Sequence, residues 1–435
     1  MRDYAAVLAG RDFRRLWLGA SLSTVGDGMT LVALSWLVLD RYGTALLGLL
    51  AVCATAPVFV GGLVAGPLLD RFDKRTVLAA DSVIRGVVVA SVPITAAAGR
   101  MPSWLPFAVA AVYGLLKMVP MAGVPAAIPD LVDTAGLDAA NALESVGYAV
   151  SGIVGYALAG TLVAAMGAPN VLALDAASYL LFAVAVRAVR RPLGPHRDPV
   201  DAAPAEAATE RRLREICTEV PAAIRDGVRG TTWLVRDRVL VVTTLAFMAF
   251  NVAEGALVLV TGPWLAKDRL PGGAGMLALL LAALSAGELL GGVLAGAWRP
   301  GRDRVKAIAV AQIAAATGFL AVLAVPDRVT VAAGFLLIGL CGVPMTVWAQ
   351  SLRMERVPAR LRGRVFGTLR TLMQATPPIG AALVTPLLGQ GHITTAAIGM
   401  ALVAGLPAVA LLLLPGEARS DGPGSRTRVL TLTND

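Results

Sequence analysis

The sequence predicts an all-α membrane protein with twelve transmembrane helices in two six-helix bundles. The chain of 435 residues is 57% hydrophobic and only 15% charged, and its mean hydropathy of +0.72 lies outside the range of soluble proteins. Continuous apolar runs of about 20 residues, the length that crosses a bilayer as a helix, recur along the whole chain. One long polar segment divides these runs into two sets of six.

The apolar runs predict helices because they are continuous and rich in Ala, Leu, Val and Gly. Strands of a membrane barrel would instead alternate polar and apolar residues over about ten positions. Gly and Pro inside several runs are tolerated where membrane helices pack against neighbours. The first six predicted spans are residues 14–39, 45–69, 76–98, 104–127, 139–166 and 169–190. The second six are residues 238–263, 275–298, 304–325, 329–352, 363–390 and 393–414.

The polar break at residues 191–237 is predicted to be a cytoplasmic linker, flexible in its Pro- and Ala-rich first part. It separates an N-terminal bundle, residues 1–190, from a C-terminal bundle, residues 238–418. Residues 419–435 are expected to form a disordered cytoplasmic tail.

Basic residues are distributed asymmetrically about these spans. Thirty of the 38 Lys and Arg residues fall on the side of the termini and linker, five on the opposite side and three inside spans. Positively charged loops stay in the cytoplasm, so both termini are expected there, in a protein of the cell membrane. The net charge of +9 is thus a topology signal, and no nucleic-acid partner is expected.

The two halves share landmarks at a nearly constant spacing, which indicates an internal duplication. Three pairs lie 229 or 230 positions apart: Gly66 and Gly296, Pro129 and Pro358, and Gly160 and Gly389. Each half has an even number of spans, so the two copies share one orientation in the membrane, as in parallel transporter repeats.

The loop between the second and third spans, GPLLDRFDKR, places five charged residues between two apolar runs. It resembles the loop signature G-x-x-x-D-R-x-G-R-[RK] of the major facilitator superfamily, with Asp73 where glycine is usual. The matching residues are Gly66, Asp70, Arg71, Lys74 and Arg75. The resemblance implies a gating latch that steadies the outward-open state and breaks as the cytoplasmic side opens. Gly66 is expected to allow a close helix approach. The alternative is a loop that only anchors the topology.

Other segments are similar to the enterobactin exporter and macrolide efflux branch of that superfamily, among them RDFRRLWLGASLSTVGDGMTLVAL and ERVPARLRGRVFGTLRTL. The fifth span resembles the antiporter motif G-P-x-x-G-G at Gly155 and Gly160. Tyr156 replaces the proline of that motif and Ala159 replaces one glycine, so the motif is not independent support for antiport.

Charged residues inside the spans are functional candidates, since each costs about 2.5–3.5 kcal/mol at a helix centre on the insertion scale. Those assigned to proton coupling or to a cavity between the halves are Asp27, Lys117, Glu254, Glu288 and Arg370. Asp27 and Lys117 are the preferred pair, because neither has a partner on its own helix. A carboxylate and a cation facing one cavity can exchange a proton near neutral pH.

The other charged residues inside the spans are given structural roles, except Asp175, whose role the sequence leaves open. Asp81 and Arg85 are spaced i, i+4 and are predicted to satisfy each other as a structural pair. Glu144 is expected to cap one end of the fifth span. Asp175 either anchors a helix–helix contact or faces the cavity.

The resemblance implies a proton-coupled exporter, an antiporter working by alternating access on a small amphipathic molecule such as a drug, macrolide or siderophore. An importer of the same fold and a nontransporting membrane sensor are the alternatives. The proton gradient is the expected energy source, without a cofactor. The expected partners are a small-molecule substrate and the lipid bilayer, and the fold usually functions as a monomer.

Enzymatic chemistry is not expected. The sequence lacks a GxxxxGK[ST] phosphate loop, and Cys53, Cys217 and Cys341 lack CxxC spacing. His196 and His392 are isolated. No disulfide, metal site or catalytic constellation is therefore predicted.

Overall fold

The computed structural model describes residues 2–133, 136–193, 237–298, 300, 304–357, 369, 372–373 and 375–413. All regular structure within these residues is helical, which confirms the predicted fold class. Most of the predicted linker, the predicted tail and Arg370 lie outside the described residues.

The N-terminal bundle follows the predicted spans closely. Its elements are α1 (Arg2–Ala9), α2 (Arg11–Tyr42), η1 (Thr44–Leu46), α3 (Leu47–Arg71), α4 (Lys74–Ala97), α5 (Leu105–Leu116), α6 (Met118–Leu131), α7 (Leu137–Met166) and α8 (Ala168–Arg187). The predicted fourth span is divided into α5 and α6 at Lys117. Gly43 ends α2 at a φ of 76°, a left-handed conformation that glycine adopts without strain.

The C-terminal bundle has the same plan. Its elements are α10 (Arg238–Ala256), η3 (Leu257–Thr261), α11 (Gly262–Asp268), α12 (Gly273–Ala297), α13 (Arg304–Gly318), η5 (Phe319–Ala324), α14 (Arg328–Arg356), α16 (Thr376–Gly389) and α17 (Ile393–Leu412). Asp237 and Asp327 cap α10 and α14 by accepting backbone N–H bonds. The Thr330 hydroxyl and the Val329 N–H hold the pKa of Asp327 below its usual value.

Eleven of the described helical segments are long and apolar enough to cross a membrane. The remaining predicted span, residues 363–390, is described mainly over α16, so the count of twelve is only partly covered. Many apolar side chains point outward, such as Val87 (61% exposed), Val184 (66%) and Val293 (64%). Water-soluble proteins rarely expose so continuous an apolar surface, whereas the lipid of a membrane can surround it without cost.

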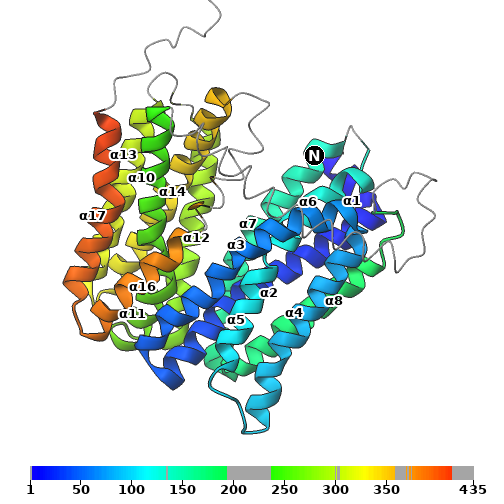
Figure 1. Cartoon of the computed structure of the whole chain (residues 1–435), viewed down its shortest axis with the longest axis horizontal. Helices are drawn as coiled ribbons and strands as arrows, with labels where there is room; N and C mark the ends of the chain where they lie inside the picture. Colours follow the sequence, from blue (N-terminus) through cyan, green and yellow to red (C-terminus); the bar gives the residue numbers. More distant parts are fainter. Residues whose placement is uncertain are drawn as a thin grey trace, which may run out of the picture.

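The two bundles form a V. In Figure 1 they diverge toward the side that carries the N-terminus and approach each other at the opposite side. There α7 packs on α12 and α3 packs on α16. Lys267 of α11 also donates to the Leu39 carbonyl at 2.7 Å and lies 3.7 Å from Asp40. We call these contacts the closed end.

Small residues set the distances between helices inside each bundle. A Cβ built on Gly61 of α3 would lie 1.9 Å from the Leu115 carbonyl oxygen, and one on Gly114 of α5 would lie 2.3 Å from the Ala54 carbonyl oxygen. The two backbones therefore touch through reciprocal glycines, as small residues permit in membranes.

Substitution of Gly61 by Ala is expected to lower the thermal unfolding temperature of the purified protein, because overpacking costs roughly 1–3 kcal/mol. The neighbouring Gly62→Ala is the matched control, since a Cβ there would meet Met118 at an ordinary 3.7 Å. Thiol-dye or light-scattering melts of the two variants in detergent make the comparison. Equal melting temperatures would contradict the backbone contact.

Candidate functional site

A cavity of about 750 Å³ lies between the two bundles. Helices α2, α3, α5, α6, α7 and α8 line it from one side, and α10, η3, α12 and α16 line it from the other. On α2 its lining residues run from Trp17, near the start of the helix, only to Leu31. The closed end lies beyond that point. The cavity is therefore open on the side of the N-terminus and shut on the other.

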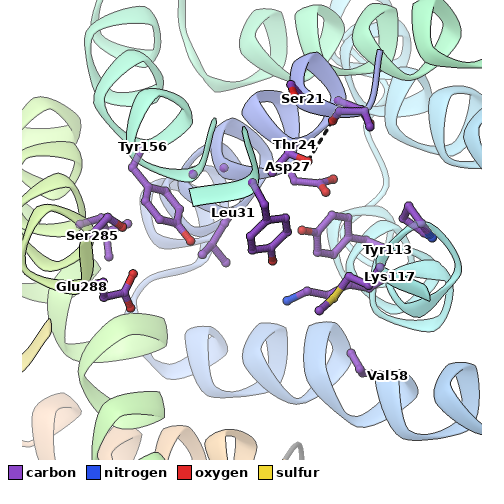
Figure 2. Close-up of a pocket in the computed structure, with 18 of the residues that line it drawn as sticks. Ser21, Thr24, Asp27, Leu31, Val58, Tyr113, Lys117, Tyr156, Ser285 and Glu288 are labelled. Atoms are coloured by element: carbon purple, nitrogen blue, oxygen red, sulfur yellow. Dashed lines mark hydrogen bonds between the residues drawn. The ribbon is translucent and has the colours of Figure 1, made fainter. Parts of the chain in front are cut away.

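Asp27 of α2 lies on the N-terminal wall of this cavity (Figure 2). Its Oδ1 accepts a hydrogen bond from the Tyr179 hydroxyl at 2.5 Å and lies 3.5 Å from a guanidinium nitrogen of Arg85. Arg85, on α4, is 1% exposed and stacks on the Tyr179 ring, 4.7 Å from its centroid. Three helices thus converge on one cavity carboxylate.

Arg85 also holds Asp81, as the i, i+4 spacing predicted. Its Nε donates to Asp81 Oδ2 at 3.0 Å, and a second nitrogen binds the same oxygen. The structure adds that the pair is not self-contained, because the same guanidinium faces Asp27. One arginine therefore stands between two carboxylates, of which one is buried and one lines the cavity.

Asp175 takes the helix-contact role of the two that the sequence left open. It is fully buried on α8, where Ser178 donates to it at 3.0 Å and Thr30 of α2 also binds it. A Cβ on Gly26 would lie 1.9 Å from its Oδ1. Asp175 therefore sits against the backbone of α2, behind the wall that carries Asp27.

Lys117 lies at the junction of α5 and α6 and lines the same cavity as Asp27. Figure 2 shows its side chain pointing into the cavity beside Tyr113. Lys117 keeps helical dihedral angles (φ −51°, ψ −35°), so the chain passes through it with little change of direction. The preferred pair of the sequence analysis thus faces one cavity, together with Tyr113.

The C-terminal wall carries two carboxylates, Glu254 of α10 and Glu288 of α12. Figure 2 shows Glu288 and Ser285 side by side on this wall. A Cβ on Gly255 would lie 2.4 Å from the Cα of Pro377, so α10 and α16 touch next to Glu254. Four of the five candidates assigned to coupling or cavity from sequence therefore line the cavity, and Arg370 lies outside the described residues.

The charged loop between α3 and α4 is bound within the N-terminal bundle. Asp73 caps α4 at a φ of −59° by accepting from the Arg75 N–H at 2.9 Å, so glycine is not needed there. Lys74 pairs with Asp130 at 2.8 Å, and Arg75 donates to the Arg191 carbonyl at 2.5 Å.

Two other residues of that loop signature, Asp70 and Gly66, lie in open surroundings. Asp70 is exposed at the end of α3. No described atom of another helix lies within 4 Å of a Cβ built on Gly66. The expected close approach at Gly66 is therefore absent in this conformation, in which the bundles are apart on this side. Its repeat mate Gly296 has equally open surroundings among the described residues.

The two glycines of α7 each meet another helix. A Cβ on Gly155 would lie 2.5 Å from the Val25 carbonyl oxygen of α2. A Cβ on Gly160 would lie 2.3 Å from the Ala278 Cβ of α12. Gly155 therefore packs inside the N-terminal bundle, whereas Gly160 belongs to the closed end between the bundles.

The expectation that Glu144 caps a helix is wrong. Helix α7 begins at Leu137 after Gly136, so Glu144 lies two turns inside it and lines the cavity. The predicted span began at residue 139, which placed Glu144 too near an end. Tyr148 and Tyr156 of the same helix also line the cavity, and the sequence analysis assigned neither to it. Tyr148 follows Glu144 by four residues, the helical spacing that could have placed it on the same face.

Comparison with known proteins gives consistent relatives. A family model described as a transmembrane secretion effector matches residues 4–421. An uncharacterized MFS-type transporter, y4rN, of Sinorhizobium fredii is 26% identical over 414 residues, which cover 93% of this chain and 95% of that protein. The multidrug efflux pump Tap of Mycolicibacterium fortuitum is 25% identical over 397 residues, which cover 90% of this chain and 92% of the pump.

Solved structures share the fold. The peptide transporter POT in complex with sulfate is similar with a TM-score of 0.70 at 14% identity, over 93% of this chain and 94% of that one. The nucleoside transporter NupG is similar with a TM-score of 0.68 at 13% identity, over 92% and 98% of the two chains. At these identities the likeness concerns the architecture alone.

A cysteine at Ser145, an exposed cavity residue of α7, is expected to react with a membrane-impermeant thiol reagent from the side of the N-terminus. A cysteine at Ala45, exposed in η1 at the opposite end, is expected to react from the other side. Native cysteines are first replaced, and labelling is compared in right-side-out and inverted vesicles with an N-terminal tag as reference. Labelling of both positions from one side would contradict the arrangement.

Proposed function

The chain belongs to the transmembrane secretion effector family of the major facilitator superfamily, and on this premise we propose that it is a proton-coupled exporter of a small amphipathic molecule. Family and fold are those of membrane transporters and not of enzymes. The observation that carries the proposal is Arg85 held between Asp27, on the cavity wall, and the buried Asp81.

This arrangement suits a proton carrier. With both carboxylates ionised, the group of Asp27, Asp81 and Arg85 holds one negative charge in excess. Burial makes an uncompensated charge costly. Protonation of one carboxylate would remove it, and the cation of Lys117 in the same cavity would offset it. The proton reaches Asp27 through the cavity, because Asp81 and Arg85 are 4% and 1% exposed. Protonation of Asp27 would leave Arg85 and Asp81 as a neutral pair, which links the proton to the contacts among α2, α4 and α8.

The cavity suits a small amphipathic substrate. Its volume of about 750 Å³ falls in the range of about 300–1,000 Å³ that is usual for small-molecule sites. Apolar lining residues such as Val258, Leu281 and Leu284 alternate with charged and hydroxyl groups. Tyr113 and Met121 also line the cavity and add aromatic and apolar surface.

Outward transport is favoured by the relatives, and the charge pattern is consistent with it. The basic side of the chain is the side on which the cavity opens, and by the positive-inside rule that side is the cytoplasm. The substrate would then load from the cytoplasm of a cell membrane. The full-length similarity to a protein named multidrug efflux pump supports the same direction. Each charge moved across 100 mV supplies about 2.3 kcal/mol for such work.

Alternating access would exchange the closed end for contacts on the basic side. Breaking it separates α7 from α12 at Gly160 and frees Lys267 from Leu39 and Asp40. Closing the other side would bring the loop of Lys74 and Arg75 toward the C-terminal bundle. The open surroundings of Gly66 leave room for a helix to approach there.

Asp27→Asn is expected to abolish proton-driven export, and the size-exclusion profile of the purified variant shows whether the fold is kept. Cells producing the protein are tested for efflux of chloramphenicol and erythromycin, and inverted vesicles for proton release on addition of the exported compound. Export should fall at least tenfold, because the amide cannot take the proton. The control is Asp268→Asn, an exposed carboxylate at the end of α11.

Retention of gradient-dependent export by Asp27→Asn would contradict the proton-carrier role. Accumulation of the probes inside producing cells would instead establish the importer. A chain that moves none of a broad panel of compounds in either direction would favour the sensor.

A further inference from the structure

We propose that Glu254 and Glu288 of the C-terminal wall, together with Tyr156 of α7 in the N-terminal bundle, form a binding site for an organic cation in the cavity. The inference rests on the proposed transport function and names its substrate class: an amphipathic molecule with a permanent or protonated positive charge. It places the recognition of the substrate charge apart from Asp27, which is assigned to the proton.

The charge distribution of the cavity carries the first step. The C-terminal bundle contributes two carboxylates, Glu254 and Glu288, to the described lining residues, and neither a lysine nor an arginine. Within the described part of the chain, no Lys or Arg nitrogen lies within 4.0 Å of either carboxylate. On the opposite wall Asp27 already has Arg85. The N-terminal wall also carries Glu144, but Lys117 lines the cavity on that side as well. Among the described lining residues, the C-terminal wall is therefore the wall that has carboxylates and no cation.

The carboxylates of Glu254 and Glu288 would be stabilised by a cation bound from the cavity. Two carboxylates in an apolar wall repel each other, and burial without a counter-charge is costly for each. Both are only partly buried, so a molecule in the cavity can reach them. A bound ammonium or other organic cation would supply the missing charge.

Tyr156 gives the site its aromatic component. Figure 2 shows its ring projecting into the cavity on the same side as Ser285 and Glu288. The contact of α7 and α12 at Gly160, one turn beyond Tyr156, fixes this proximity. An aromatic face attracts a cation within about 6 Å of its centroid. The residue that replaces the proline of the antiporter motif thus faces the cavity next to a carboxylate.

The apolar residues beside the two carboxylates indicate the chemistry of the uncharged part of the ligand. Leu259, Leu281 and Leu284 line the same wall, so the charged group is flanked by apolar surface. A small, strongly hydrated cation would leave that surface without contacts. A bulky lipophilic cation would satisfy both the carboxylates and the leucines.

Binding of radiolabelled tetraphenylphosphonium to the purified full-length protein tests the proposal without any transport step. The wild type is expected to bind it saturably, and radiolabelled tetraphenylborate, an anion of the same size and shape, is expected not to bind when it is tested in a separate sample without the cation. Glu254→Gln/Glu288→Gln should weaken binding at least tenfold, because the charge is lost and the shape is kept. Asp268→Asn, outside the cavity, should bind as the wild type does.

The aromatic component is tested separately. Tyr156→Phe keeps the ring and should bind within about twofold of the wild type, whereas Tyr156→Leu should weaken binding several-fold. Should the double glutamine variant fail to fold, as judged by size-exclusion profile, Glu288→Gln alone decides, with an expected loss of at least threefold.

Equal affinity for the cation in the wild type and the glutamine variants would overturn the site, as would equally tight binding of tetraphenylborate tested alone or absence of saturable binding of the cation. The export proposal fails differently: Asp27→Asn would then leave efflux unchanged, or no compound would be exported, while glutamate-dependent binding of the cation persisted. Glutamate-dependent binding together with loss of export in Asp27→Asn supports both.

Discussion

The Arg85 guanidinium, held between Asp27 and Asp81, is the interaction on which the N-terminal bundle depends. A charge inside the membrane cannot rely on bulk water, so each of these groups needs another. Asp81 is supplied by the same helix, whereas Asp27 and Tyr179 come from α2 and α8. Satisfying one arginine therefore fixes the relative positions of three helices. The same arrangement leaves the Asp27 carboxylate at the cavity wall. Its contact with Arg85 therefore holds helices together and also belongs to the proposed proton site.

Close backbone contacts complement this polar network. Hydrophobic burial gives little preference between helix–helix and helix–lipid contacts in a membrane, so packing distance matters. Gly61 and Gly114 join α3 to α5 within one bundle, and Gly160 joins α7 to α12 between the bundles. The contact at Gly160 differs from the others because it shuts one end of the cavity. Small residues thus serve two purposes: some hold a bundle together permanently, and others form a contact that alternating access would have to break.

The two walls of the cavity differ although the two bundles have the same plan of helices. On the N-terminal wall Asp27 is tied to Arg85, and Lys117 adds a cation to the same cavity. On the C-terminal wall Glu254 occupies the helix that corresponds to that of Asp27, yet the described lining there offers no cation. One wall therefore has an internal counter-charge, whereas the described part of the other wall has none. This difference permits the proton and a charged ligand to use separate places in one cavity.

The sequence alone determined the fold class, the positions of the spans and the charged residues within them. Apolar length and the distribution of Lys and Arg are local properties, and the bilayer imposes them on every span. The sequence also identified Asp27, Lys117, Glu254 and Glu288 as candidate cavity residues, because a charged residue stands out among the apolar residues of a span. Only the tertiary structure decided which of these groups meet. Spacing along α4 paired Asp81 with Arg85, but the 3.5 Å approach of Arg85 to Asp27 joins residues 58 positions apart. Likewise, the place of Glu144 in the cavity depends on where α7 begins and which face it turns inward, and packing against other helices sets that face.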